Sequence, residues 1–325
     1  MDLLILGGTA WLGRELSAIA LDRGHAVTCI ARGTSGGVAE GARFIAADRD
    51  SYDFADIAAD SFDAIIELTW QPGQCGDALR ALAGRAKHWT FVSSCSVYAS
   101  HRDVDGDESA ELLAATSALR AEMSEYGEAK VACEVATRGF VGDRLLLVRP
   151  GLIGGSGDMS DRAGAWVARC AGFPDESLMV PDSLDLVTQV IDVRDLAKWA
   201  VGAIENGLTG TFDAVGPQMS LGDWIALARQ VAGHSGEVRA VDPSWLIEQG
   251  VSEFMGPESL TMWLHDPEWR GFMARTGAAA MWAGLTHTPR AALMQDLLEW
   301  ETFCGLYRER RSGLSIEREC ELQSW

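Results

Sequence analysis

The chain has 325 residues, of which 47% are hydrophobic and 23% are charged, so it carries enough apolar material for a folded core and is not intrinsically disordered. Its formal net charge of −20 excludes nucleic acid and anionic membrane surfaces as default partners. The longest apolar runs fall short of the roughly 18 residues that a membrane span needs, and the run 3–6 is too short for a signal peptide.

Short apolar runs alternate with amphipathic stretches through the first 150 residues. Buried strands are expected over 3–6, 25–31, 43–47, 63–68, 88–93 and 144–148. Helices are expected over 12–23, from after residue 68 to near residue 87, and over about 113–139. Continuous apolar strands separated by helices are typical of a parallel sheet covered on both faces. Right-handed crossovers then predict an α/β fold with a Rossmann-type doubly wound parallel sheet.

The composition changes after residue 150, where Gly and Pro become more frequent and nine of the twelve tryptophans lie. We expect residues 1–150 to form the first domain, with segments of about 185–215 returning to it. Residues 151–325 should form mostly a smaller, interleaved α/β cap. The charged tail 308–325 is expected to pack loosely.

The cysteines and histidines show no metal-site or disulfide pattern. The seven cysteines contain no CxxC pair: Cys29, Cys75, Cys95, Cys133, Cys170, Cys304 and Cys320. The six histidines include no HExxH spacing. We therefore expect a reduced, cytoplasmic protein without a bound metal.

A glycine-rich stretch follows the first expected strand and opens the first helix. Its candidate cofactor-binding residues are Gly7, Thr9, Ala10, Trp11, Leu12 and Gly13. Gly7 permits a tight turn, small Ala10 lets the backbone approach a pyrophosphate, and Gly13 allows close packing of helix on sheet. The helix N-terminus supplies amide donors and a positive dipole end. The stretch predicts a dinucleotide-binding loop.

The end of the second expected strand bears on the choice between the two nicotinamide dinucleotides. An NAD site usually places an acidic residue there to accept from the ribose, whereas this chain has Arg32, which suits a 2′-phosphate. We therefore favour NADP(H) over NAD(H), with a solvated surface arginine as the alternative. Asp48 is a candidate for the adenine amino group, although a loop aspartate equally caps a helix. Leu68, at the end of the fourth expected strand, is added to the cofactor set.

Tyr126 and Lys130 lie four residues apart in an expected helix and so share one face of it. An adjacent ammonium stabilises a phenolate, which makes the tyrosine a usable acid/base near neutral pH. Three serines follow the fifth strand, where parallel sheets place their ligand crevice. Ser94 is the candidate that holds a substrate oxygen, and Ser93 and Ser96 are turn residues in this interpretation.

Together these motifs resemble the extended short-chain dehydrogenase/reductases, the NAD(P)-dependent epimerase/dehydratase group. The resemblance covers most of the chain and rests on residues 6–13, 92–98, 126–130, 148–151, 190–197, 210–216 and 284–300. It implies that Ser94 contacts the substrate oxygen, that Tyr126 is the acid/base, and that Lys130 also binds the cofactor ribose. It implies a structural role for Arg149, and pairing of two copies through the helix with the YxxxK motif.

The departures from the family pattern narrow the expected chemistry. Dehydratases of this group carry Thr-Asp-Glu where this chain has Ser94-Cys95-Ser96, so dehydration is not favoured. The leading interpretation is an NADPH-dependent reductase with Tyr126 as acid/base, acting on a small carbonyl substrate that is apolar or aromatic if the cap aromatics line its pocket. The alternatives are an NDP-sugar epimerase with tightly held NAD(P), and a non-catalytic NADP-binding or RNA-associated scaffold.

Two groups of cap residues bear on the substrate. Arginines that could bind a diphosphate, or simply be solvated, are Arg169, Arg229, Arg239, Arg270 and Arg275. Aromatic and Met residues that line an apolar pocket or form the cap core are Trp245, Trp263, Trp269, Trp282, Met255, Met262, Met273 and Met281.

Overall fold

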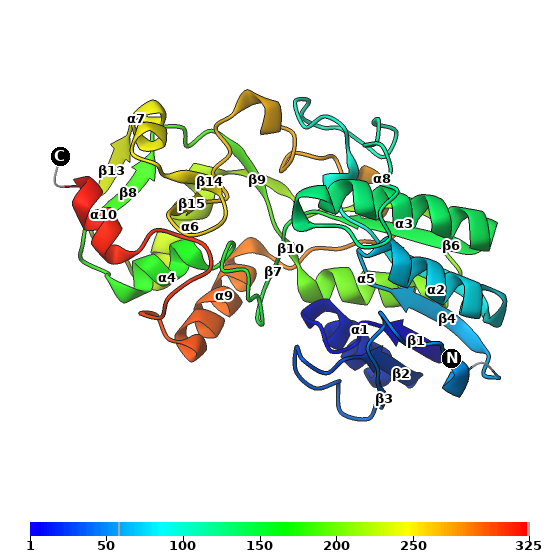
Figure 1. The fold of residues 1–325 in the computed structure, drawn as a ribbon. Helices are drawn as coiled ribbons and strands as arrows, with labels where there is room; N and C mark the ends of the chain where they lie inside the picture. Colours follow the sequence, from blue (N-terminus) through cyan, green and yellow to red (C-terminus); the bar gives the residue numbers. More distant parts are fainter. Residues whose placement is uncertain (58, 324–325) are drawn as a thin grey trace.

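A seven-stranded parallel sheet forms the larger part of the computed structural model, which describes residues 1–57 and 59–323 (Figure 1). The strand order is β11-β6-β5-β4-β1-β2-β3. The strands are β1 (Asp2–Leu6), β2 (Ala26–Ala31), β3 (Arg43–Ala46), β4 (Phe62–Glu67), β5 (Ala86–Val92), β6 (Leu145–Pro150) and β11 (Gly210–Ala214). The order reverses direction between β1 and β4, so the doubly wound sheet predicted from the sequence is confirmed.

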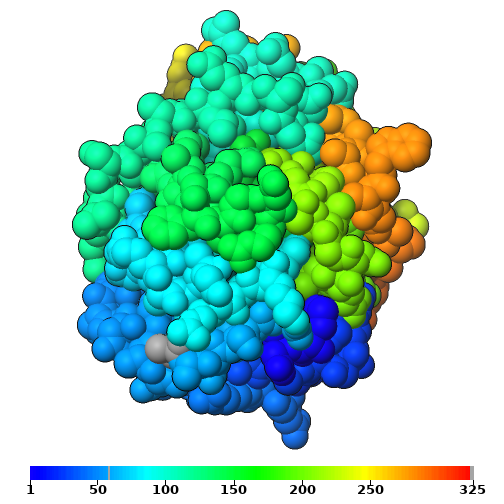
Figure 2. Space-filling model, turned by 90° about the vertical axis from the view of Figure 1, so that its right-hand side faces the viewer, coloured from blue at the N-terminus to red at the C-terminus, as the bar shows by residue number. Residues whose placement is uncertain are grey.

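Helices cover both faces of this sheet because successive strand residues point to opposite sides. Leu3 and Ile5 of β1 pack in one cluster with α1 (Trp11–Asp22) and α5 (Val193–Glu205). Leu4 and Leu6 face the other side, toward α2 (Pro72–Leu82) and α3 (Tyr126–Val141). Figure 2 shows α2 and α3 side by side on the surface, in cyan and green.

The remaining elements form the cap at the left of Figure 1, around a core of its own that includes Trp224 and Trp263. Its helices are α4 (Ala165–Gly172), α6 (Leu221–Ala232), α7 (Pro243–Glu248), α9 (Arg290–Cys304) and α10 (Ile316–Gln323). Its strand pairs are β8 (Leu178–Pro181) with β13 (Val238–Val241), and β14 (Ser252–Phe254) with β15 (Ser259–Thr261).

Short elements join the cap to the sheet. Parallel β7 (Ile153–Gly154) and β10 (Ile191–Asp192) lie between the two parts, as do antiparallel β9 (Val187–Gln189) and β12 (Gln218–Ser220). The short helix α8 (Ala278–Trp282) packs near β11. None of the helices in the described ranges is both long and apolar enough to cross a membrane.

Two predicted helices have different bounds in the structure. The helix expected over about 113–139 begins only at Tyr126, after a 3₁₀ turn over Met123–Glu125. The preceding segment bonds elsewhere: the N–H of Gly73 donates to Leu119 O at 2.7 Å, and the N–H of Ala121 donates to Gln71 Oε1 at 2.9 Å. The helix expected to end near residue 87 ends at Leu82, because β5 begins at Ala86.

The prediction of a loosely packed tail is wrong for residues 308–323; the last two residues of the tail lie outside the described part of the chain. Arg308 Nη2 donates to Asp161 Oδ1 at 2.5 Å and to Glu301 Oε2 at 3.0 Å. Glu319 accepts from Arg169 Nε at 2.6 Å. The partners of these charges, Asp161, Glu301 and Arg169, are mostly buried, so the contacts anchor the segment to the cap.

Candidate functional site

The glycine-rich loop joins β1 to α1 in the conformation that a pyrophosphate site requires. Gly7 has a φ of +106°, in the region that favours glycine. A Cβ atom on Gly13 would lie 2.3 Å from Gly7 O, so only glycine fits there. Ala10 is the N-cap of α1 and offers no side-chain hydrogen bond, and the first turn contains no acidic residue. The N–H groups in the first turn of α1 can therefore donate hydrogen bonds to an anion.

The other candidate cofactor residues lie around this loop. A Cβ atom on Gly7 would contact Leu68 Cβ at 3.2 Å, which places Leu68 against the loop. Arg32 is exposed just after β2. Asp48 is exposed after β3, where its Oδ1 accepts from the N–H of Asp50 at 3.1 Å. Asp48 therefore has a local turn-forming role, and its contact with adenine stays a prediction.

Arg32 lies close enough to Asp50 to affect it electrostatically. The hydrogen bond from Gln74 is the main cause that lowers the pKa of Asp50, and Arg120 and Arg32 contribute. The positive charge expected to recognise a 2′-phosphate is thus partly balanced by an acidic neighbour.

Tyr126 is the first residue of α3, and Lys130 lies one turn further along. Lys130 is only 3% exposed, and its Nζ donates to Thr69 O at 2.9 Å and to Val92 O at 2.7 Å. These contacts tie α3 to the carboxyl ends of β4 and β5. Both of these hydrogen-bond partners of the buried ammonium are uncharged backbone carbonyl groups. Tyr126 is half-buried, with its ring 5.7 Å from the ring of Trp70.

The serines after β5 differ in their partners. Ser93 is buried and donates to Glu134 Oε1 at 2.6 Å, so its hydroxyl serves the fold. Ser94 caps a 3₁₀ turn over Cys95–Val97, accepting from the N–H of Ser96 at 3.1 Å. A Cβ atom on Gly127 would lie 2.5 Å from Ser96 O. The first turn of α3 is therefore pressed directly against the strand end that holds Ser94.

A buried ion pair at the end of β4 was not predicted from the sequence. Arg49 Nη1 and Nη2 donate to the two carboxylate oxygens of Glu67 at 2.6 and 2.7 Å. Glu67 Oε1 also accepts from the N–H of Thr69 at 2.9 Å. The sequence could have indicated Glu67, because it is a charged residue at the end of an apolar strand. Its partner Arg49 lies 18 positions away in the sequence, so the pair itself could not be predicted.

Three further charged residues have structural roles. Arg149 is buried, with two hydrogen bonds to Glu134 and one to the hydroxyl of Tyr98 at 2.9 Å. Asp192 caps α5, accepting from the N–H of Arg194 at 2.8 Å. Asp195 accepts from the hydroxyl of Thr288 at 2.9 Å.

The aromatic and Met residues of the cap do not line one common pocket. Trp263, Met262 and Met273 are buried in the cap core. By contrast, Trp282 is 92% exposed and Met255 is 53% exposed. The interpretation of these residues as core therefore holds for the first group, and Trp245 packs partly buried against the same core. Trp269 and Met281 are exposed, like Trp282 and Met255.

The five arginines considered for a diphosphate are mostly engaged in the fold. Arg169 pairs with Glu319, and Arg275 pairs with Asp213 at 2.5 Å. Arg229 donates to Gly236 O at 2.7 Å. Arg239 and Arg270 are exposed. Arg162, which was not among the candidates, is the arginine whose charge interacts with Tyr126.

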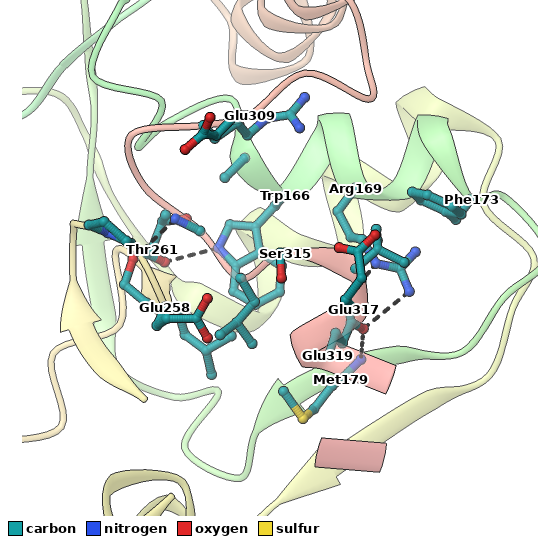
Figure 3. A pocket seen from close by; sticks show the side chains of 18 of the residues that line it. Trp166, Arg169, Phe173, Met179, Glu258, Thr261, Glu309, Ser315, Glu317 and Glu319 are labelled. Carbon is teal, nitrogen blue, oxygen red and sulfur yellow. Dashed lines mark hydrogen bonds and ion pairs between the residues drawn. The ribbon is translucent and has the colours of Figure 1, made fainter. Parts of the chain in front are cut away.

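A cavity of about 600 Å³ lies within the cap (Figure 3). It is bounded by α4, β8, β15 and the segment 306–319, with Trp166 and Arg169 on its wall. Trp166 Nε1 donates to Thr261 O at 3.0 Å across one side. None of the candidate catalytic or cofactor residues lines this cavity.

The sequence matches no protein-family model and no curated protein. Solved structures match along nearly the whole chain. A Burkholderia cenocepacia protein provisionally described as an epimerase has a TM-score of 0.71 at 21% identity, covering 92% of this chain and 97% of its own. The chain therefore shares the fold of that protein.

Two further structures with this fold carry more specific descriptions. The UDP-glucuronic acid 4-epimerase of Bacillus cereus, in complex with NAD, has a TM-score of 0.66 at 14% identity, covering 94% of this chain and 99% of its own. The UDP-Glc/GlcNAc 4-epimerase of Campylobacter jejuni has a TM-score of 0.69 at 13% identity, covering 93% and 99%. The TM-scores establish a shared fold.

Proposed function

We propose that this protein is a nicotinamide-dependent epimerase that inverts a hydroxyl-bearing carbon of a sugar substrate. One observation carries the proposal: the buried Lys130 ammonium lies one turn from Tyr126, on a helix pressed against the strand end that holds Ser94. Several solved structures with this fold are described as UDP-sugar epimerases, which supports the reaction class. An epimerase therefore ranks above the carbonyl reductase that the sequence favours.

The three side chains divide the proton chemistry. Tyr126 takes the hydroxyl proton of the substrate as the carbon is oxidised, and it returns the proton when the carbonyl is reduced from the other face. Ser94 donates to the substrate oxygen in both steps. Lys130 stabilises the phenolate of Tyr126. A bound nicotinamide would supply the hydride acceptor for the oxidation and the hydride donor for the reduction, with no net change in the cofactor.

The residues present fit such a dinucleotide. The uncapped, acid-free start of α1 supplies N–H donors for the pyrophosphate, and the space at Gly13 is too small for any side chain. Arg32 is the residue that would contact a 2′-phosphate, and we keep NADP(H) as the preferred cofactor on that basis.

A second candidate, reduction of a carbonyl compound with net use of NADPH, is favoured by the same arginine. Arg32 directly follows β2, at the position where an NAD site usually has an acidic residue. Since an epimerase regenerates its cofactor in each cycle, the two reactions differ in cofactor balance.

The deciding experiment incubates the protein with NAD⁺ or NADP⁺ and with UDP-glucose, UDP-N-acetylglucosamine or UDP-glucuronic acid, and then resolves the 4-epimers by chromatography. A parallel assay follows NADPH absorbance with a panel of ketones and aldehydes. Epimer formation without net NAD(P)H production supports the proposal. Net oxidation of NADPH supports the second candidate, and inactivity in both assays of protein that binds the cofactor contradicts both.

A further inference from the structure

A loop after β7 connects the cofactor-binding loop to the cap. Trp11, the first residue of α1, donates from Nε1 to Ser156 O at 2.8 Å. Gly157 has a φ of +94°, and a Cβ atom there would lie 2.6 Å from Trp11 Nε1. The loop therefore rests on the helix start that the cofactor would contact.

The same loop ends in Arg162, whose side chain lies between the sheet domain and the cap. Its Nε donates to Ser160 Oγ at 3.1 Å, and its guanidinium carbon lies 5.3 Å from the centre of the Phe254 ring. Its charge interacts with Tyr126 and with Asp158. The Nη atoms receive no hydrogen-bond partner from the part of the chain that the structure describes.

This arrangement leaves a partly dehydrated guanidinium without a carboxylate at ion-pair distance among the described residues. Burial lowers the pKa of Arg162, which shows that the site penalises the charge. Burial also raises the pKa of the nearby Asp158 carboxyl group, whose Oδ2 atom is buried without a hydrogen bond. A charge held this way is stabilised when an anion binds both free nitrogens.

The loop is held firmly by a distant segment. Asp161 has a φ of +61°, which is strained for a residue with a side chain. Its carboxylate accepts from Arg308 Nη2 at 2.5 Å and from the N–H of Arg311 at 2.8 Å. Ser312 Oγ donates to Ser160 O at 2.9 Å. Such contacts fix the backbone from which Arg162 projects.

We propose that Arg162 binds an oxyanion of the substrate, a phosphate or a carboxylate, close to the hydroxyl on which Tyr126 acts. The inference rests on the proposed function for the position of that hydroxyl. The planar fork of the guanidinium pairs with two oxygens of one anion, which fixes the orientation of the substrate as well as its affinity. Arg162 is thus a binding and positioning residue for the substrate.

The test is calorimetric binding to the full chain saturated with NADP⁺, with UDP-glucose, UDP-glucuronic acid and free glucuronate as probes. R162Q should weaken binding at least tenfold, and R162K less, because lysine keeps the charge but loses the two-pronged contact. If Arg162 binds a phosphate, R162Q should lose affinity for both UDP-sugars equally. If it binds the carboxylate, R162Q should lose affinity for UDP-glucuronic acid and glucuronate alone.

The matched control is R85Q, which removes an exposed arginine between α2 and β5 and should leave all affinities unchanged. Cofactor binding and thermal stability of R162Q should equal those of the wild type, which separates a binding defect from misfolding. Unchanged probe affinities in R162Q, or no binding of any probe to the wild type, would overturn the inference. Binding lost in R162Q while the wild type shows no turnover would contradict the proposed function alone.

Discussion

Glu67 and Lys130 do not touch, yet a single residue links them. Thr69 gives its N–H to the Glu67 carboxylate and its carbonyl oxygen to the Lys130 ammonium, each at 2.9 Å. Because Glu67 is itself held by Arg49, a buried ion pair fixes the carbonyl group that positions the lysine. The position of the Lys130 ammonium, one helical turn from Tyr126, thus depends on a buried ion pair at the end of β4.

Replacement of Tyr126 by Phe removes the proposed acid/base and keeps the ring. Turnover should fall by about 10²-fold or more, which is typical for loss of a positioned proton donor. The affinity for NADPH should stay within about twofold, since the phenol is not needed for the pyrophosphate or the adenosine. Steady-state kinetics and cofactor titration test the two expectations, and wild-type rates in Y126F would remove the tyrosine from the mechanism.

Replacement of Glu67 by Ala leaves Arg49 buried without its carboxylate. The free energy of unfolding should fall by about 3–5 kcal/mol, the usual cost of breaking one side of a buried ion pair. R120A, which removes the exposed pair with Asp50, should cost less than about 1 kcal/mol. Denaturant unfolding compares the two, and an equal effect would show that burial of the Glu67 pair has no energetic weight.

Gly13→Ala inserts a methyl group where Gly7 O already lies. We expect the loop to shift and NADPH affinity to drop at least tenfold, with reduced stability. Gly84→Ala is the matched control, because a Cβ atom there would meet nothing within 4 Å. Isothermal titration and thermal unfolding give both readouts; normal binding by G13A would mean that the loop is not the pyrophosphate site.

Arg32→Ala tests the choice of cofactor. Loss of one charged hydrogen bond, roughly 1.5–3 kcal/mol, should reduce the preference for NADPH over NADH tenfold or more. Trp11 beside the loop gives a fluorescence signal for the titration. An unchanged ratio of the two dissociation constants in R32A would place any 2′-phosphate contact elsewhere.

His101 provides a pH-dependent contribution to stability. Its ring stacks on Trp269, with the ring centres 5.0 Å apart. Burial, with the charge of Arg275, lowers its pKa from 6.5 to about 4. Above pH 6.5 the ring is neutral whether the chain is folded or unfolded. As the pH falls from 6.5 toward 4, only the unfolded chain gains the proton, so stability decreases through this window.

His101→Phe keeps the aromatic contacts and removes the titration. The free energy of unfolding of H101F should therefore decline less between about pH 7 and pH 4 than that of the wild type. Urea unfolding at several pH values measures the difference. Parallel pH profiles for the two proteins would show that His101 titrates normally in the folded state.

The strands and the cofactor loop could be predicted because their signals are local. The residues of β1 form a continuous apolar run, and Gly7 and Gly13 lie in the strand–turn–helix context that the motif needs. The segment before Tyr126 has helical spacing, but its backbone bonds to Gln71 and Gly73, far away in sequence. The spacing of apolar residues does not predict that tertiary hydrogen bonds will keep a segment out of a helix.

The charged parts of the site were the least predictable. Arg162 was missed because its role depends on a loop conformation and on Phe254, 92 positions later in the printed sequence. Arg49 and Glu67 are ordinary charged residues until the fold brings them together. The charges of the tail likewise predicted loose packing, although Arg308 forms ion pairs with Glu301 and Asp161 in the cap.

The anchoring of Arg308 on Asp161 has a consequence for synthesis of the chain. These residues are 147 positions apart, so the carboxylate of Asp161 lacks its Arg308 partner until the intervening chain has been translated. The sheet domain and its cofactor loop can fold earlier, since their strands are complete by Ala214. The proposed substrate site is therefore completed last. A nascent chain would be able to bind the dinucleotide before it could bind a substrate.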